Sequence, residues 1–153
     1  GRAMQWWGLL PIVLGVLLRS WAAGYLSKDE QMATHGPYKL VRHPLYLGSC
    51  FLALGIIITL RHWLVTVVIG GLTALQYFHT IRHEEENLKN RFGHRYLKYC
   101  SEVGAVFPKL RNFKRLAEDS DIKFSIKQYL KNKEYECLLG VCVLLLILSL
   151  SSR

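Results

Sequence analysis

The chain has 153 residues, about half of them hydrophobic (51%) and a fifth charged (20%), and its formal net charge at pH 7 is +9. This length fits one domain, but such a composition fits poorly in a small soluble globule unless the apolar residues gather in blocks. They do gather in blocks, and basic residues flank them, where the anionic headgroups of a bilayer lie. The composition therefore favours a membrane protein and argues against nucleic-acid binding.

The first apolar block covers residues 6–26 and is interrupted only by Pro11, Arg19 and Ser20. A membrane-spanning helix needs about 20 mostly apolar residues, so this block predicts a first span. The block is longer than the apolar core of a signal peptide, and no small-residue cleavage pattern follows it. The chain starts at Gly1 rather than Met, as expected for a trimmed chain or a piece of a longer one.

The second apolar block, residues 46–78, is broken near its middle by Arg61 and His62. An unbroken helix of that length would measure about 50 Å, well beyond a hydrocarbon core of about 30 Å. The block therefore predicts a helical hairpin whose turn lies at the far interface. A third block, residues 135–150, predicts a short last span.

Positive charge orients the predicted spans. The connection 27–42 carries three Lys or Arg residues, and the segment 82–133 carries thirteen. Basic loops stay in the cytoplasm, so both connections are expected there, with four spans and both chain ends outside. The basic stretch after Pro108 has interspersed apolar residues, as expected for an amphipathic segment on the anionic leaflet. We therefore predict an all-α integral membrane protein with about four membrane helices, including a helical hairpin.

Polar residues concentrate in two stretches, 28–46 and 82–99, which the charge pattern places at the same membrane face. In the first stretch, residues 35–38 (His-Gly-Pro-Tyr) are a turn signal, because Gly permits a positive φ and Pro presets φ. Further on, Pro44 disfavours a helical His43 and suits the first turn of the next helix. We expect a rigid, non-helical strip there, with free backbone N–H groups and a helix N-terminus suited to an anionic group.

The second stretch contains three successive acids, Glu84, Glu85 and Glu86. Successive helical residues point about 100° apart, so the three acids spread over about 200° and cannot share one partner. One or two are expected to point inward, toward Arg42 and His43, because an acid at the end of a membrane helix needs a cationic partner. A solvated acidic surface turn stays the alternative.

Other small and polar residues indicate structural roles. The glycines of the apolar blocks are expected to allow close helix packing rather than to bind a ligand, with Gly48 beside the motif as the exception. The packing glycines are Gly15, Gly24, Gly55, Gly70 and Gly71. His62, His79 and His94 lack the spacing of a metal site, and the four cysteines show no zinc or disulfide spacing. No metal site is predicted.

A series of motifs runs through the middle of the chain in a fixed order. They are Gly36-Pro37-Tyr38, Arg42-His43-Pro44-Leu45-Tyr46-Leu47-Gly48, Glu84-Glu85-Glu86-Asn87-Leu88, Arg91-Phe92-Gly93-His94-Arg95-Tyr96, Tyr99 and Phe107-Pro108. With these motifs the chain resembles the isoprenylcysteine carboxyl methyltransferases and the related phospholipid methyltransferases, most closely their short prokaryotic-type homologues. The resemblance covers residues 18–110.

The resemblance implies methyl transfer from S-adenosyl-L-methionine, in a pocket capped by a cytoplasmic helical segment, to a lipidic or small amphipathic acceptor that enters from the bilayer. It also implies which residues hold the cofactor: Gln31, Met32, Ala33, Tyr38, His43, Pro44, Leu45, Tyr46 and Glu84. The cofactor's carboxylate would meet backbone N–H groups and His43, and its positive charge would meet Glu84. Methyl transfer from a sulfonium needs alignment and exclusion of water rather than a nucleophilic residue.

With this resemblance the chain is interpreted as one membrane methyltransferase domain, residues 1–153. Residues 1–45 would form the first span and the cofactor loop, 46–82 the hairpin, 83–133 the cytoplasmic cap and basic amphipathic segment, and 134–153 the last span. The active site would face the cytoplasm, in a bacterial inner membrane or, in a eukaryote, in the endoplasmic reticulum. Membrane lipids are the other expected partners.

The methyl acceptor stays open between two chemistries. Thr80 stands where isoprenylcysteine enzymes tend to have an Arg that is thought to meet the substrate's carboxylate. Arg82 or His79 is the candidate to reach a carboxylate acceptor here. A phospholipid-like amine would instead need deprotonation, for which Glu85 or His83 would serve. Glu85 and Arg82 are therefore the predicted catalytic residues.

Two other functions compete with methyl transfer. The sterol and steroid reductases of membranes share a His-Pro-x-Tyr element, and an NADPH-dependent reductase is the first alternative. A non-catalytic membrane adaptor is the second, with the polar strips as packing and the basic segment as a lipid anchor. Binding of S-adenosylmethionine, of NADPH, or of neither would separate the three.

Overall fold

The computed structural model describes most of the chain, in residues 6–26, 31–60, 62–116 and 122–151. In these ranges the secondary structure is helical, and the one β-type contact is an isolated parallel bridge between Val41 and Gly104. The all-α prediction is therefore confirmed for the described part of the chain. Arg61, predicted in the hairpin turn, and Lys28, in the first basic connection, lie outside it.

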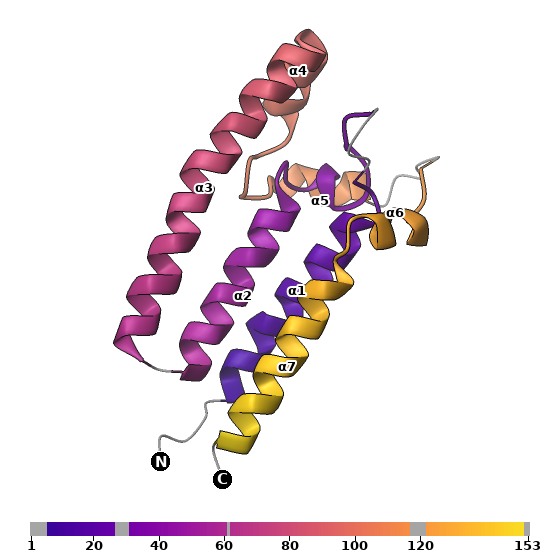
Figure 1. Ribbon diagram of the computed structural model, residues 1–153. Coiled ribbons are helices and arrows are strands. Elements are labelled where there is room, and N and C mark those ends of the chain that lie inside the picture. Colours follow the sequence, from indigo (N-terminus) through magenta and orange to yellow (C-terminus); the bar gives the residue numbers. More distant parts are fainter. Residues whose placement is uncertain (1–5, 27–30, 61, 117–121, 152–153) are drawn as a thin grey trace.

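Four apolar helices run along a common direction (Figure 1). They are α1 (Leu9–Ala23, preceded by the short 3-10 helix η1, Trp6–Gly8), α2 (Pro44–Leu60), α3 (Trp63–Phe92) and α7 (Tyr135–Ser151). The stretch Trp6–Ala23 and helix α3 are long and apolar enough to cross a membrane. Helices α2 and α7 are shorter apolar helices. The described residues thus contain two candidate membrane spans.

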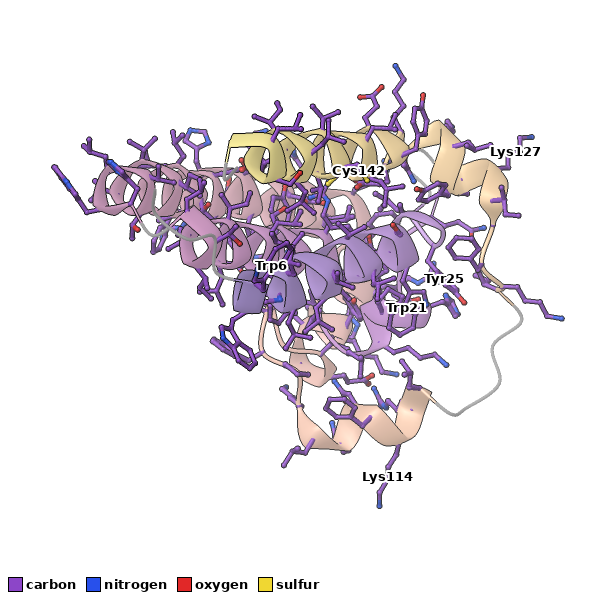
Figure 2. The ribbon with its side chains drawn as sticks, turned by 90° about the horizontal axis from the view of Figure 1, so that it is seen from below. Trp6, Trp21, Tyr25, Lys114, Lys127 and Cys142 are labelled. Atoms are coloured by element: carbon purple, nitrogen blue, oxygen red, sulfur yellow. The ribbon has the colours of Figure 1, made fainter. Side chains whose placement is uncertain are left out.

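The shorter elements gather at one end of the molecule, which we call the polar end (residues 31–43, 84–116 and 122–134) (Figure 1). They are η2 (Gly36–Lys39), α4 (His94–Glu102), α5 (Leu110–Leu116) and α6 (Ile126–Lys131). The connection between α2 and α3 lies at the opposite end (Figure 1). The stretch after Pro108 forms two short helices, and on them Lys114 and Lys127 point away from the helical body (Figure 2).

The predicted breaks in the chain are confirmed. Helix α2 begins at Pro44 directly after the non-helical His43, and Gly36 begins η2 with a φ of +59°. Helix α3, however, does not end near residue 82 but continues to Phe92, so the three acids stand on the hairpin's own return helix. Its 30 residues measure about 45 Å, so its last turns project beyond a hydrocarbon core of about 30 Å. Gly93, with a φ of +50°, ends α3 and lets α4 turn back.

Helices α1 and α2 pack with almost no space between their backbones. A Cβ on Gly15 would lie 2.7 Å from the carbonyl oxygen of Gly48, and one on Gly55 would lie 2.6 Å from that of Gly8. Such small residues let two apolar helices approach closely, and the resulting van der Waals contact holds helices together where both face lipid. The predicted packing role of Gly15 and Gly55 is confirmed, and Gly48, the predicted exception, shares it. The prediction is wrong for Gly70 and Gly71 within the described part of the chain, because a Cβ there would meet no described heavy atom within 4 Å.

Substitution of Gly15 tests this contact. We expect Gly15→Ala to destabilise the protein by about 1–3 kcal/mol, because the new methyl group meets rigid backbone of α2. Gly71→Ala in α3 is the matched control, since a Cβ there would meet no described heavy atom within 4 Å. Thermal unfolding in detergent measures both. A melting temperature of Gly15→Ala equal to that of Gly71→Ala would contradict the packing account.

Candidate functional site

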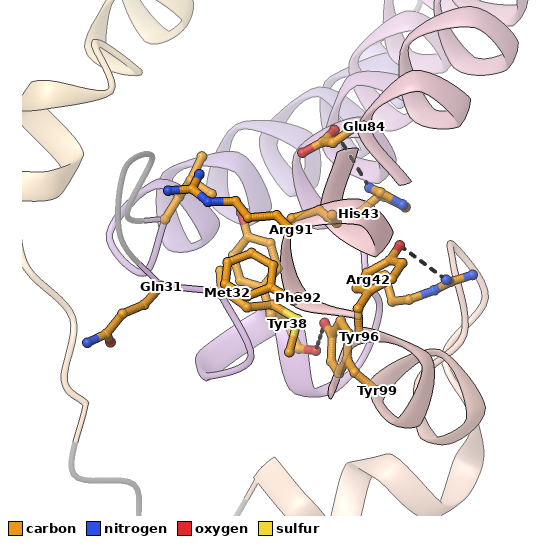
Figure 3. Close-up of a pocket in the computed structure, with 13 residues that line it drawn as sticks. Gln31, Met32, Tyr38, Arg42, His43, Glu84, Arg91, Phe92, Tyr96 and Tyr99 are labelled. Carbon is orange, nitrogen blue, oxygen red and sulfur yellow. Dashed lines mark hydrogen bonds and ion pairs between the residues drawn. The ribbon is translucent and has the colours of Figure 1, made fainter. Parts of the chain in front are cut away.

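A cavity of about 240 Å³ opens at the polar end, between the end of α1, the strip before α2, and helices α3 and α4 (Figure 3). Its walls come from segments far apart in the sequence. The lining residues are Leu26, Gln31, Met32, Ala33, Tyr38, Arg42, His43, Glu84, Leu88, Arg91, Phe92, Tyr96 and Tyr99. The two polar stretches of the sequence thus meet in one place.

The non-helical strip before α2 is held in place by hydrogen bonds from its backbone N–H groups. The N–H of Arg42 donates to the carbonyl of Gly104 (2.9 Å), and the N–H of His43 donates to the carbonyl of Ala105 (3.1 Å). These bonds make the strip rigid, as expected, but they also correct one expectation. The N–H groups of Arg42 and His43 are not free for a ligand, because the loop after α4 already accepts from them.

One carboxylate oxygen connects this strip to α3. Oε1 of Glu85 lies 3.0 Å from Nε2 of His43 and 3.1 Å from Nη1 of Arg42. On the other side of the same imidazole, Oε2 of Glu84 lies 4.0 Å from Nδ1 of His43. The His43 side chain is almost fully buried, so both of its nitrogens face acids in a largely dry setting. Two of the three acids point inward, as the helical spacing predicts.

The Arg42 guanidinium is the cation of this cluster. Burial alone would lower the pKa of Arg42, but the neighbouring Glu85 and Cys100 outweigh burial, so its pKa is raised and it stays charged. The same Nη1 atom contacts Sγ of Cys100 and lies 3.5 Å from the hydroxyl of Tyr96 (Figure 3). Arg42 therefore connects α4 to the acid of α3.

Aromatic rings form the other wall of the cavity. Tyr38 and Tyr96 are buried, and the hydroxyl of Tyr99 donates to the backbone carbonyl of Tyr38 at 2.6 Å (Figure 3). Burial raises the pKa of all three tyrosines, so they stay neutral and keep their protons for hydrogen bonding. Phe92 closes this side. A flat apolar or cationic group can pack against such rings.

The predicted cofactor residues divide into two groups. Six line the cavity: Gln31, Met32, Ala33, Tyr38, His43 and Glu84. Pro44, Leu45 and Tyr46 form the first turn of α2 beside it, outside the lining. The ring of Tyr46 packs edge-on against His43, with centroids 5.8 Å apart, so this turn supports the imidazole.

The two predicted catalytic residues have different surroundings. Glu85 bonds to His43, which lines the cavity. Arg82 lies in a separate shallow cavity with His79, His83, Glu86 and two apolar side chains. Residues two positions apart on a helix point about 200° apart, so Arg82 faces away when Glu84 faces inward. The structure does not bring Arg82 to the His43 cluster.

Several lining residues were not predicted as site residues, namely Leu26, Arg42, Leu88, Arg91, Phe92, Tyr96 and Tyr99. A sequence signal for two of them existed. Tyr96 and Tyr99 are three residues apart, which puts their rings on one face of a helix, whereas Phe92 ends the preceding helix. Because Gly93 breaks α3 from α4, that face turns toward Tyr38.

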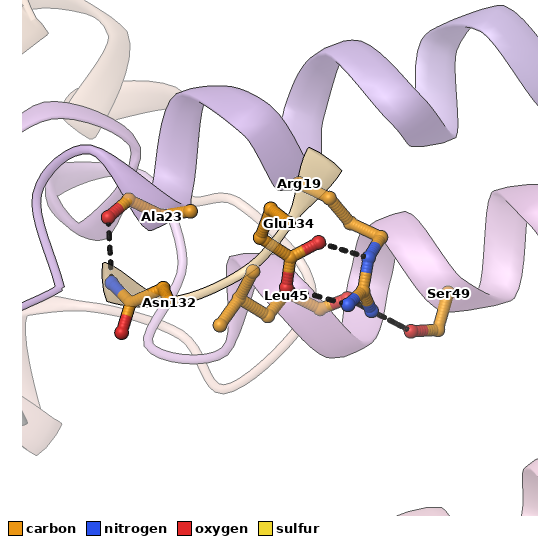
Figure 4. Close-up of polar contacts among 6 residues, drawn as sticks. All are labelled: Arg19, Ala23, Leu45, Ser49, Asn132 and Glu134. Atoms are coloured by element: carbon orange, nitrogen blue, oxygen red, sulfur yellow. Dashed lines mark hydrogen bonds and ion pairs between the residues drawn. The ribbon is translucent and has the colours of Figure 1, made fainter. Parts of the chain in front are cut away.

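A second polar cluster fixes the helices beneath the site (Figure 4). Arg19 of α1 makes two hydrogen bonds to Glu134, from Nε (3.0 Å) and from Nη2 (2.7 Å), and a third from Nη1 to the hydroxyl of Ser49 on α2 (2.6 Å). Asn132 donates to the free carbonyl of Ala23 at the end of α1 (2.8 Å). The start of α7 is thereby tied to α1 and α2, next to the first turn that carries the motif.

Among the residues that the structure describes, no group of three or more His, Cys, Asp or Glu side chains could hold a metal ion. The described cysteines form no disulfide. The side chains that line the cavity are acids, cations, aromatic rings and apolar groups.

Apolar helices with a polar cavity at one end define a membrane-associated helical protein with an enclosed site. The sequence profile of the phospholipid methyltransferase family matches residues 4–95, and the chain belongs to this family. The predicted family relationship is confirmed. The profile covers the motif strip and the three acids.

The curated relatives of this chain include methyltransferases and a metal-resistance protein. The chain is 35% identical to a cobalt-zinc-cadmium resistance protein of Cupriavidus metallidurans, over 67% of this chain and 48% of that protein. It is 28% identical to protein-S-isoprenylcysteine O-methyltransferase B of Arabidopsis thaliana, over 71% and 63%. It is 32% identical to the protein-S-isoprenylcysteine O-methyltransferase of Mus musculus, over 70% and 42%. The chain thus spans about half the length of these relatives, and no solved structure matches it.

The hydrogen bond of Tyr99 tests the architecture of the aromatic wall. We expect Tyr99→Phe to cost about 1 kcal/mol of stability, because the carbonyl of Tyr38 loses its donor while the ring is kept. Tyr129→Phe is the control, since the hydroxyl of Tyr129 has no hydrogen bond to a described residue. Melting temperatures in detergent compare the two, and equal values would show that the bond contributes nothing.

Proposed function

We propose that this protein transfers a methyl group from S-adenosyl-L-methionine to a lipidic or small amphipathic acceptor at a membrane. The observation that carries the proposal is the convergence of six predicted cofactor residues on one cavity. They come from the loop before η2, from η2 itself, from the strip before α2 and from α3, and nothing in local sequence forces these segments together. Membership in the phospholipid methyltransferase family supports the same reaction.

The side chains of the cavity suit S-adenosylmethionine. Glu84 offers a carboxylate to the cofactor's positive charge, and the rings of Tyr38, Phe92 and Tyr96 offer apolar faces to a flat base or to a sulfonium. His43 lines the same cavity, so its buried ring lies beside the bound cofactor. The bound cofactor supplies an activated methyl group. The residues of this chain orient it and exclude water.

Glu85 acts on the acceptor through His43. Its carboxylate lies 3.0 Å from Nε2 of His43 and does not itself line the cavity. For an amine acceptor, His43 takes the proton that must leave before or during transfer, and Glu85 stabilises the imidazolium. For a carboxylate acceptor, the cations of the lining, Arg42 and Arg91, meet the negative charge. Arg82 takes no part in this proposed site, because it faces away from the cavity.

The proposed membrane arrangement follows the charge pattern. Helices α1, α2, α3 and α7 cross the bilayer as four spans, and the polar end with its basic segment lies in the cytoplasm and caps the cavity. Residues 1–153 form one domain in this arrangement. Three observations support it: the common direction of the apolar helices, the gathering of the polar connections at one end, and the polar projection of α3 (Figure 1).

The other two functions receive less support. A sterol-type reductase would require NADPH, and a passive adaptor would require no cofactor. The family match and the enclosed acidic and aromatic cavity favour a methyltransferase over both. The acceptor is either isoprenylcysteine-like or phospholipid-like. Incubation of the protein with labelled S-adenosylmethionine and a membrane lipid extract would identify it.

Cofactor binding tests the proposal directly. Calorimetry of detergent-purified protein with S-adenosylhomocysteine is expected to show binding in the micromolar range, weakened about tenfold or more by His43→Ala and by Glu84→Ala. Glu86→Ala is the matched control, since Glu86 lies on the other face of α3 and should leave the affinity unchanged. Absence of binding to a folded wild-type protein would overturn the proposal. Equal effects of all three variants would overturn the assignment of the acids.

A further inference from the structure

Large apolar side chains are exposed around the short helix α5, at the polar end of the molecule. Phe107, just before this helix, is 85% exposed, Leu110 is 88% exposed and Phe113 is 51% exposed. Asn112, on another side of the same helix, is fully buried. Three apolar groups exposed so close together are unfavourable in water, so this side of α5 is expected to have a partner.

The position of α5 suits a membrane surface. It lies level with the start of α2 and across the direction of the apolar helices (Figure 1). Seen from below, Lys114 stands on the outer side of α5 and points away from these helices (Figure 2). The start of α2 lies at the cytoplasmic interface in the proposed membrane arrangement, so α5 lies in the plane of that interface, as amphipathic surface helices do.

The apolar side of α5 faces the proposed bilayer. Nη1 of Arg115 pairs with Oε2 of Glu102 at 2.9 Å, and Glu102 ends α4, the helix that extends beyond α5 at the polar end (Figure 1). Successive helical residues point about 100° apart, so Leu110 lies about 140° and Phe113 about 160° from Arg115 around the helix. Since Arg115 faces outward to α4, Leu110 and Phe113 face back toward the level of the apolar helices.

The charge of α5 matches anionic headgroups. The sequence of the helix, Leu-Arg-Asn-Phe-Lys-Arg-Leu, contains three cations and no acid. Arg115 is paired with Glu102, and Arg111 is attracted by the same carboxylate. Lys114, by contrast, points away from the body, and a lysine beside apolar side chains at a bilayer surface extends its ammonium group to the headgroups (Figure 2).

The inner side of α5 supports the aromatic wall of the candidate cofactor cavity. Nζ of Lys39 in η2 donates to the backbone carbonyl of Arg115 at 3.1 Å. Nδ2 of Asn112 donates to the backbone carbonyl of Glu102, at the end of α4, at 3.2 Å. Helix η2 carries one tyrosine of the wall and α4 carries two. Helix α5 therefore joins, from outside, the two elements that form this wall.

We propose that α5 docks on the surface of an anionic bilayer, and that this contact braces the aromatic wall and tightens cofactor binding. The docking follows from the exposed apolar side chains, the orientation of the helix and its charge. The effect on the cavity rests on the proposed function, because it needs a bound cofactor. A bilayer without anionic lipid holds α5 less firmly, so the affinity for the cofactor falls with it.

The contact of α5 with lipid can be measured without a cofactor. The full chain, in nanodiscs of three parts phosphatidylcholine to one part phosphatidylglycerol, carries the photoreactive residue benzoylphenylalanine in place of Phe113. The matched control carries it in place of Leu97, which is 48% exposed but stands on α4, the helix that lies farther out. After irradiation, mass spectrometry identifies the lipids attached to each protein.

We expect lipid adducts at position 113 and almost none at position 97, with phosphatidylglycerol above its share in the bilayer. No adduct at position 113, or equal adducts at both positions, would overturn the docking. Adducts at position 113 in the proportions of the bulk lipids would overturn the preference for anionic lipid.

The affinity for S-adenosylhomocysteine tests the effect on the cavity, by calorimetry in the mixed nanodiscs and in nanodiscs of phosphatidylcholine alone. We expect wild type and Leu97→Ser to bind about fivefold more tightly in the mixed nanodiscs, and Phe113→Ser to bind equally in both. Each variant is compared with itself, so a general loss of stability cancels. A lipid effect that Phe113→Ser retains, or its absence in wild type, would overturn the link between α5 and the cavity.

Failure of this inference is distinguishable from failure of the proposed function. Lipid adducts at position 113 without any binding of S-adenosylhomocysteine would contradict the proposed function and the link, and would leave the docking supported. Binding of S-adenosylhomocysteine without lipid adducts at position 113 would contradict this inference alone.

Discussion

The position of α3 depends on the carboxylate of Glu85, which bonds to His43 and lies within ion-pair distance of Arg42. Helix α3 has little other attachment, because only 6% of its most apolar stretch is buried inside the protein. Away from the polar end, Tyr77 of α3 makes an edge-on contact with Tyr46 of α2, with ring centroids 6.3 Å apart. Much of the apolar surface of α3 is thus exposed. The rotation and shift of α3 against α2 are set at the polar end, because the charged side chains there have few alternative partners.

The remainder of the bundle gives this contact a firm base. Small residues bring α1 and α2 together, and the Arg19–Glu134 pair adds the start of α7. The strip before α2 is fixed from the other side by backbone bonds to the loop after α4. Because both sides of the strip are held, His43 has little freedom to turn. The cavity is therefore largely formed in the protein itself, a condition that favours alignment of reacting groups.

Much of this organisation is predictable from sequence, because its causes are local. Pro44 sets the start of α2, Gly36 sets the turn before it, and helical spacing separates Glu84 and Glu85 from Glu86. Helical spacing alone does not exclude Arg82, because it stands three residues before Glu85 and about 60° from it around α3. Its place in a separate cavity follows from the tertiary structure.

Other features are not predictable because they join distant segments. Arg19 interrupts an apolar block, and its partner Glu134 lies 115 residues away, so no local pattern indicates the pair. The bonds from the N–H groups of Arg42 and His43 to the loop at 104–105 are of the same kind. The apolar run of residues 46–78 does not show the full length of α3, because the last turns of this helix are polar. Apolar runs indicate the part of a helix in lipid, whereas its true end is set by Gly93.

We propose that the motif strip and the acids of α3 act as one site through the contact of His43 with Glu85. The most direct measurement is a double-mutant cycle with His43→Ala and Glu85→Ala, read as the affinity for S-adenosylhomocysteine. We predict a coupling free energy of about 1 kcal/mol or more, with the double variant little worse than the weaker-binding single variant. Effects that simply add, as expected for His43 with Glu86, would contradict the account.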